Sequence, residues 1–131
     1  MKKITACLLF LLIINALKAQ VDPAIFDKFE SRILIIDGYK INVEVKGNGD
    51  PIFFIPGGPG NSHDYMQGAF GQYYKTNTVV FFDFLGRGKS DDAKNKNEYS
   101  VENDTELIEK IRQQLGFEKI SVVGHSYGRG P

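Results

Sequence analysis

The pentapeptide Gly124-His125-Ser126-Tyr127-Gly128 constrains the fold of this chain more than any other feature. It directly follows the apolar run 120–123, which is expected to form a β-strand. In a G-x-S-x-G turn between a strand and a helix, the serine takes a strained backbone conformation, and a side chain at either glycine would collide with neighbouring backbone. The serine hydroxyl is thereby exposed. The pattern therefore predicts a strand that ends in a nucleophile elbow at Ser126.

A serine hydroxyl is a weak nucleophile until a histidine accepts its proton and an acid orients that histidine. In a strand–elbow–helix arrangement, both partners follow the serine along the chain. No histidine or acidic side chain follows Ser126 in this sequence. We therefore expect the front half of a serine hydrolase, inactive by itself and produced by a truncated or frame-shifted gene model. Translation of the DNA beyond Pro131 is expected to find an aspartate and a later histidine.

The N-terminal residues have the order of a secretory signal peptide. Lys2 and Lys3 precede an apolar stretch over 4–17, and Lys18-Ala19-Gln20 follows it. A stretch of about 14 residues is shorter than the ~20 that a membrane-spanning helix needs. We expect residues 1–19 to be removed and residues 20–131 to form a partial hydrolase domain. The protein is then secreted or periplasmic, without stable membrane insertion after cleavage.

Charge and cysteine content exclude several functions. Without the three N-terminal lysines the chain has 13 basic and 16 acidic residues, so neither nucleic acid nor an anionic membrane is an expected partner. The single cysteine, Cys7, lies in the segment expected to be removed. Disulfides, thiol catalysis and a cysteine-based zinc site are therefore not expected. We expect no metal and no cofactor.

Hydrophobic patterning along the rest of the chain predicts an α/β sheet. Asp37-Gly38 separates two β-branched runs and favours a two-residue hairpin turn. Ser100 can cap a helix that ends before Gly116. The expected strands are 32–36, 39–46, 52–55, 78–82 and 120–123, and the expected helices are 62–74 and 101–115. Ligands of such sheets bind beyond the carboxyl ends of the strands. The three glycine-rich segments of this chain, at 56–60, 83–90 and 124–128, are all expected there.

These three segments resemble the N-terminal half of the α/β-hydrolase superfamily, and within it the proline iminopeptidase (prolyl aminopeptidase) group. They are Pro56-Gly57-Gly58-Pro59-Gly60 with residues 61–65 behind it, Asp83-Phe84-Leu85-Gly86-Arg87-Gly88-Lys89-Ser90, and the elbow. Each follows a predicted strand, in the expected order. Two details differ from the group's usual pattern: Pro56 replaces a histidine, and the elbow usually reads Gly-Gly-Ser-Trp-Gly.

The resemblance implies a role for each segment. Ser126 would be the nucleophile that forms an acyl-enzyme, and the backbone amides of Gly58 and Tyr127 would form the oxyanion hole. The other motif positions would be structural: Gly57, Pro59, Gly60, Asp83, Gly86, Gly88, Gly124 and Gly128. The substrate would be a small peptide with a free N-terminal residue, often proline, or alternatively a carboxylic ester. Residues 56–60 could also be no more than a tight connecting turn. Because the elbow is present in the same chain, we favour the oxyanion hole for this segment.

Neither of the two histidines is expected to be the catalytic base. His125 neighbours Ser126, but a turn that exposes the serine directs the adjacent side chain away from it. His63 occurs much earlier than the base of the resembled family. We expect His63 to be a polar residue near the rim of the substrate pocket.

A nucleotide-binding function is the remote alternative. Gly88-Lys89-Ser90 matches the end of the phosphate-binding pattern G-x-x-x-x-G-K-[ST]. That pattern would need glycine at the position of Asp83, and a carboxylate there would repel phosphate. We assign residues 83–90 to structure, with Asp83 and Ser90 satisfying amides of the loop. A thermal shift assay without nucleotide-dependent stabilisation would exclude the alternative.

Overall fold

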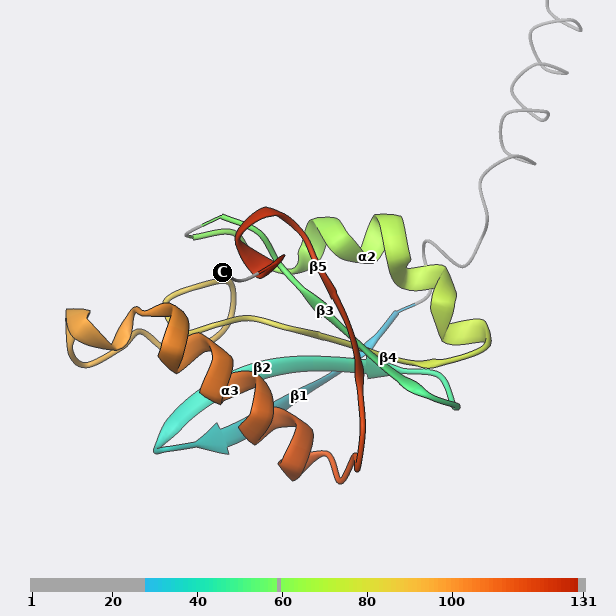
Figure 1. Ribbon diagram of the computed structural model, residues 1–131, viewed down its shortest axis with the longest axis horizontal. Helices are drawn as coiled ribbons and strands as arrows, with labels where there is room; N and C mark the ends of the chain where they lie inside the picture. Colours follow the sequence, from blue (N-terminus) through green and yellow to red (C-terminus); the bar gives the residue numbers. More distant parts are fainter. Residues whose placement is uncertain (1–27, 59, 130–131) are drawn as a thin grey trace, which may run out of the picture.

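The architecture is a mixed, five-stranded β-sheet with helices on both faces (Figure 1). A computed structural model describes residues 28–58 and 60–129. The expected signal peptide at 1–19 and the motif residue Pro59 lie outside these ranges. The strands, in the order β1-β2-β4-β3-β5 across the sheet, are β1 (Glu30–Ile36), β2 (Tyr39–Lys46), β4 (Thr78–Phe82), β3 (Pro51–Ile55) and β5 (Ser121–Gly124). The predicted α/β class is confirmed.

Strand direction changes within the sheet. β1, β2 and β4 pair antiparallel, whereas β3 runs parallel to both β4 and β5. The β1–β2 hairpin closes through Asp37 (φ 53°) and Gly38 (φ 81°), and both positive angles fit the twisted turn that an Asp-Gly pair favours. Because β3 and β5 are parallel neighbours, the loop after β3 and the turn after β5 emerge at the same edge of the sheet.

Two hydrophobic clusters lie on opposite faces of the sheet. The side chains of β4 alternate between them, so that Val80 and Phe82 belong to one cluster and Val79 and Phe81 to the other. The first cluster contains Leu107 and Ile111 of the helix α3, and the second contains Met66 of the helix α2. The helical segments are α2 (Asp64–Phe70), η2 (Gly71–Lys75), η3 (Lys96–Glu98), α3 (Val101–Gln114) and η4 (Ser126–Arg129).

The two predicted helices differ in how well they match the structure. α3 has the expected caps: the Ser100 hydroxyl accepts a hydrogen bond from the Asn103 amide at 3.2 Å, and Gly116 (φ 76°) follows its end. The segment predicted to be a helix over 62–74 is helical, but it begins at Asp64 and changes at Gly71 from α2 into the 3-10 segment η2. Glycines at 68 and 71 weaken a continuous α-helix there. Among the described residues, no helix is long and apolar enough to cross a membrane.

The packing of α3 on the sheet generates a stability prediction. Ile111 is 0% exposed, and Ile111→Ala should lower the free energy of unfolding by about 2 to 5 kcal/mol, because it removes buried methyl groups and leaves a cavity. Ile35→Ala is the matched control: Ile35 is 57% exposed, so its loss should cost no more than about 0.5 kcal/mol. Urea unfolding monitored by circular dichroism measures both. Equal effects would contradict the assignment of α3 to the core.

Candidate active site

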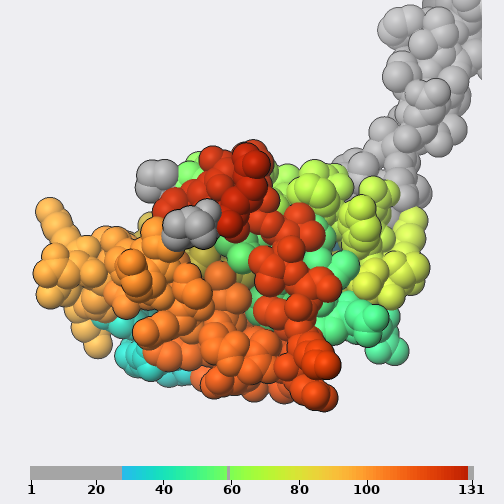
Figure 2. Space-filling view, in the orientation of Figure 1, coloured from blue at the N-terminus to red at the C-terminus, as the bar shows by residue number. Residues whose placement is uncertain are grey.

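The elbow is a tight turn at the carboxyl end of β5. β5 ends at Gly124, and η4 begins at Ser126, whose φ of 51° lies in the left-handed region that side chains rarely adopt. The turn is held by hydrogen bonds from the His125 amide to the Ile55 carbonyl (3.2 Å) and from the Gly128 amide to the His125 carbonyl (2.9 Å). Ser126 is exposed, and Figure 2 shows this last described segment at the molecular surface. The strained serine backbone is the geometry that the G-x-S-x-G pattern predicts.

Backbone crowding explains both flanking glycines. A Cβ atom on Gly124 would lie 2.0 Å from the carbonyl oxygen of Gly128. A Cβ atom on Gly128 would lie 2.5 Å from the carbonyl oxygen of Ile55. Side chains never approach backbone so closely, so any substitution at these two positions forces the turn or β3 to move.

The loop after β3 packs directly against the elbow. Gly57 is buried, and a Cβ atom on it would lie 2.6 Å from the His125 carbonyl oxygen and 3.0 Å from the Ser126 Cβ. Gly58 (φ 66°) and Gly60 (φ 100°) continue the loop with positive angles that favour glycine. The structure therefore brings the segment predicted to form the oxyanion hole beside the predicted nucleophile. The roles of Gly58 and Tyr127 as amide donors stay predictions.

The Tyr127 side chain anchors the elbow to α3. Its hydroxyl donates to Asp104 Oδ2 (3.0 Å), and Arg87 Nη1 lies 3.1 Å from the same oxygen. The Arg87 guanidinium also stacks between the rings of Tyr127 and Phe84, at 5.2 and 4.7 Å from their centroids. Burial raises the pKa of Asp104 above its usual range, against the opposing effect of Arg87. Burial and the bond to Asp104 raise the pKa of Tyr127.

Sequence reasoning missed Arg87 and Asp104. Asp104 is a buried acid on the face of α3 that carries Leu107 and Ile111. A carboxylate in an apolar helical stripe needs a buried partner, and this signal could have found the pair. Its partner comes from the loop after β4, within the motif 83–90.

The Asp83 carboxylate fills the loop that follows β4. Its Oδ2 accepts the Lys89 amide at 3.1 Å, while the Ser90 hydroxyl donates to the Asp83 carbonyl at 2.7 Å. A Cβ atom on Gly88 (φ 55°) would lie 2.2 Å from Asp83 Oδ2, and one on Gly86 (φ 69°) would lie 2.7 Å from the Tyr99 hydroxyl. These contacts support the structural role predicted for residues 83–90. The Asp83 carboxylate occupies the loop at the position where it was expected to repel a phosphate.

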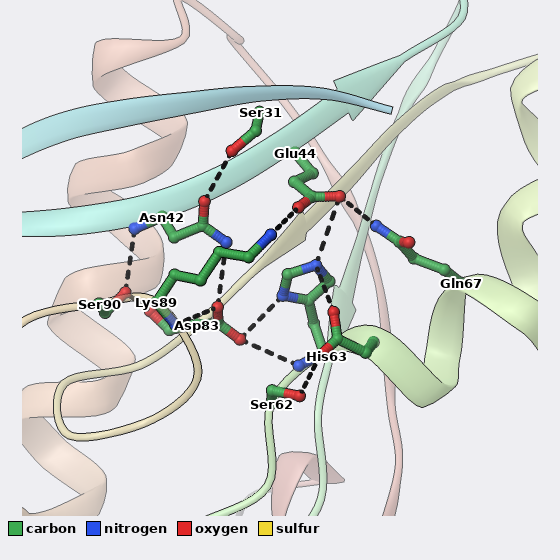
Figure 3. A network of polar contacts seen from close by, with 10 residues as sticks. Ser31, Asn42, Glu44, Ser62, His63, Gln67, Asp83, Lys89 and Ser90 are labelled. Atoms are coloured by element: carbon green, nitrogen blue, oxygen red, sulfur yellow. Dashed lines mark hydrogen bonds and ion pairs between the residues drawn. The ribbon is translucent and has the colours of Figure 1, made fainter. Parts of the chain in front are cut away.

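The sequence led us to expect His63 near the rim of the substrate pocket, but the structure buries it. It is 0% exposed and forms the centre of a polar network beneath α2 (Figure 3). Its Nδ1 is 2.8 Å from Asp83 Oδ1, which also accepts the His63 amide at 3.0 Å. Its Nε2 faces the carboxylates of Glu44 (3.6 Å) and Asp64 (3.8 Å). The expectation was wrong because the partner that draws the ring inward, Asp83, is 20 residues away in sequence.

The same network changes two pKa values. Burial lowers the pKa of His63, but the hydrogen bond to Asp83 and the charges of Asp83, Glu44 and Asp64 outweigh it, so the pKa is raised above 6.5. Burial raises the pKa of Asp83, yet its bonds from His63 and from the Lys89 amide lower it overall to about 2. The two shifts share one cause, because each group stabilises the charged form of the other across the 2.8 Å hydrogen bond.

Two further observations concern metal binding and the position of the main surface hollow relative to the elbow. Within residues 28–58 and 60–129, no group of three His, Cys, Asp or Glu side chains could hold a metal ion. A hollow of about 160 Å³ lies between the β1–β2 hairpin and α3, and its lining includes Tyr39, Asp104 and Lys110 but none of residues 124–128. The candidate active site is therefore the exposed edge formed by the elbow and the loop after β3.

Comparison with known proteins identifies the family of this chain and several similar proteins. A family model described as "alpha/beta hydrolase fold" matches residues 50–128. The proline iminopeptidase of Saccharolobus solfataricus is 34% identical, over 72% of this chain and 36% of its own length. This chain spans about a third of the length of the curated relatives that it matches.

Solved structures show the same fold. The proline iminopeptidase-related protein of Thermus thermophilus superposes with a TM-score of 0.72 at 24% identity, over 78% of this chain and 38% of that protein. An epoxide hydrolase from Vigna radiata superposes with a TM-score of 0.67 at 22% identity, over 76% of this chain and 32% of that protein. Both similarities show the fold alone.

The His63–Asp83 pair predicts how stability depends on pH. Because folding raises the pKa of His63, its contribution is complete below pH ~6.5 and is lost as the pH rises through the higher pKa of the folded state. Because folding lowers the pKa of Asp83 from 3.8 to about 2, its contribution is present above pH ~3.8 and is lost as the pH falls toward 2. Urea unfolding across this pH range should show stability declining at both ends.

Variants separate this pair from the other titrating groups. His63→Gln should remove the alkaline decline, whereas His125→Gln, which changes the other histidine of the chain, should retain it. An alkaline decline that persists unchanged in His63→Gln would refute the assignment.

Proposed function

The chain belongs to the alpha/beta hydrolase family, and on that premise we propose that Ser126 is the nucleophile of a hydrolase that works through an acyl-enzyme. One observation carries the proposal: Ser126 is an exposed serine with a φ of 51° between β5 and η4. A strained conformation of this kind is retained where the surrounding structure enforces it, and such positions cluster at functional sites. Close packing of the Gly57 loop against the same serine supports the proposal.

In the proposed reaction, Ser126 Oγ attacks the substrate carbonyl carbon and its proton passes to a histidine base. The negative charge that develops on the carbonyl oxygen is stabilised by the amides of Gly58 and Tyr127, each worth about 3 to 4 kcal/mol in the transition state. Collapse of this intermediate breaks the bond to the amine or alcohol, which takes the proton from the histidine. Water then hydrolyses the acyl-enzyme by the same steps in reverse order.

The histidine base of this mechanism is neither His63 nor His125. His63 is fully buried against Asp83, and Nδ1 of His125 is engaged by the Tyr65 hydroxyl at 3.0 Å. We propose that the base and its acid belong to the part of the relatives' length that this chain does not span. The 131-residue chain by itself is then a poor catalyst.

For the substrate we propose a small peptide with a free N-terminal residue, often proline, which the enzyme releases. The support is the similarity to the proline iminopeptidase of S. solfataricus at 34% identity. A carboxylic ester hydrolase would use the same serine. Pro56, which replaces the histidine usual in the iminopeptidase loop, is the observation that keeps this second candidate open.

The nucleophile is tested by covalent labelling. In a form of the protein that spans the full length of its relatives, Ser126→Ala should abolish labelling by a fluorophosphonate probe, because only an activated serine attacks the phosphorus readily. Ser62→Ala is the control: it removes another serine hydroxyl, which donates to Asp64, and should label normally. Retained labelling in Ser126→Ala would show that another residue is the nucleophile. The 131-residue chain should label slowly or not at all.

Two substrates separate the candidate activities. The full-length form should release the arylamine from a proline arylamide, and blocking the substrate's amino group should reduce turnover strongly. A short-chain nitrophenyl ester reports the esterase alternative. Ester turnover without amide turnover would count against the peptidase, and an N-blocked peptide cleaved as fast as a free one would exclude recognition of the N-terminus.

A further inference from the structure

We propose that Tyr65 is a positioning residue of the active site, whose hydroxyl ties the oxyanion loop to the elbow. The inference rests on the proposed function, since it gives Tyr65 a role only if the Gly57 loop and Ser126 act on the same substrate. Tyr65 lies in the first turn of α2 and is 45% exposed. Neither the motifs nor the family resemblance assigns it a role.

The Tyr65 hydroxyl joins the two segments by a chain of hydrogen bonds. The Gly57 amide donates to the Tyr65 oxygen at 2.7 Å, and the same oxygen is 3.0 Å from His125 Nδ1. The Tyr65 oxygen thus contacts both the loop amide and the imidazole of the elbow, and a hydroxyl can both donate and accept. The Tyr65 and His125 rings also meet edge to face, with centroids 5.6 Å apart.

The backbone that carries Tyr65 is fixed from both sides. His63 precedes it and is bound to Asp83 through both its amide and its ring. Met66 follows it and is 0% exposed in the cluster beneath α2, with its amide bonded to the His63 carbonyl at 2.8 Å. An exposed tyrosine held between two fully buried residues can place its hydroxyl with little conformational freedom.

The hydrogen bond from the Gly57 amide to the Tyr65 hydroxyl determines which amide of the loop is left for the substrate. Gly57 is buried and its N–H is directed to Tyr65, so the peptide plane before Gly57 is fixed. The chain then turns at Gly58, whose φ is 66°, and the Gly58 amide is the one proposed to face the oxyanion. Without the Tyr65 hydroxyl, the buried Gly57 amide loses its partner and the loop is free to rotate to find another.

The test is Tyr65→Phe in the full-length form of the protein, assayed with whichever of the two substrates is turned over. We expect kcat to fall about 10- to 100-fold, because a small displacement of the oxyanion donor is costly, while KM changes less than about twofold. Hydrogen exchange at the Gly57 amide, followed by NMR, should become faster. Tyr73→Phe is the matched control, since Tyr73 is 47% exposed on neighbouring η2, and it should leave kcat and Gly57 exchange unchanged.

The outcomes distinguish this inference from the proposed function. Labelling that survives Ser126→Ala overturns the proposed nucleophile, whatever Tyr65→Phe does. If Ser126→Ala is not labelled by the probe but Tyr65→Phe keeps the wild-type kcat, the proposed role of Tyr65 is refuted and the proposed nucleophile stands. A lower kcat with unchanged exchange at Gly57 also refutes it, because the loss would not act through the loop. A rise in KM with constant kcat would assign Tyr65 to substrate binding instead of positioning.

Discussion

The buried Asp83 carboxylate is the interaction on which the arrangement of the site depends. It accepts four hydrogen bonds: from the Asn42 side chain (3.0 Å), the His63 amide (3.0 Å), the His63 ring (2.8 Å) and the Lys89 amide (3.1 Å). A buried charge is costly unless it is paired and fully bonded, and these four donors offset the cost. Because the donors come from β2, the start of α2 and the loop after β4, one side chain fixes three segments. The start of α2 then carries Tyr65 to the loop beside Ser126.

The elbow is held from two sides by side chains of other elements. On one side, Tyr65 of α2 and the Gly57 loop contact His125. On the other, Asp104 of α3 receives the Tyr127 hydroxyl. A left-handed serine backbone costs about 1 to 3 kcal/mol, and it persists only where the surrounding structure enforces it. The two attachments, together with the His125–Ile55 backbone bond, supply that enforcement.

Local sequence signals predicted the elements well and their polar contacts poorly. Strand alternation, the Asp37-Gly38 turn and the glycine pattern of the elbow each act over a few residues, and all appear in the structure. The burial of His63 depends on Asp83, and the Arg87–Asp104 pair joins a loop to a helix. Such pairs form only when the sheet brings distant segments together, so periodicity cannot predict them. The break at Gly71 was missed because the apolar residues of 62–74 continue across it.

β5, the strand that precedes Ser126, has no buried residue. β5 pairs with β3 alone among the described strands, and Val122 and Val123 are 51% and 37% exposed. Contacts from outside β5 hold the turn that contains Ser126. Ile55 supplies the backbone contact, and Tyr65 and Asp104 supply the side-chain contacts, so the geometry of the proposed nucleophile depends on α2, β3 and α3 together.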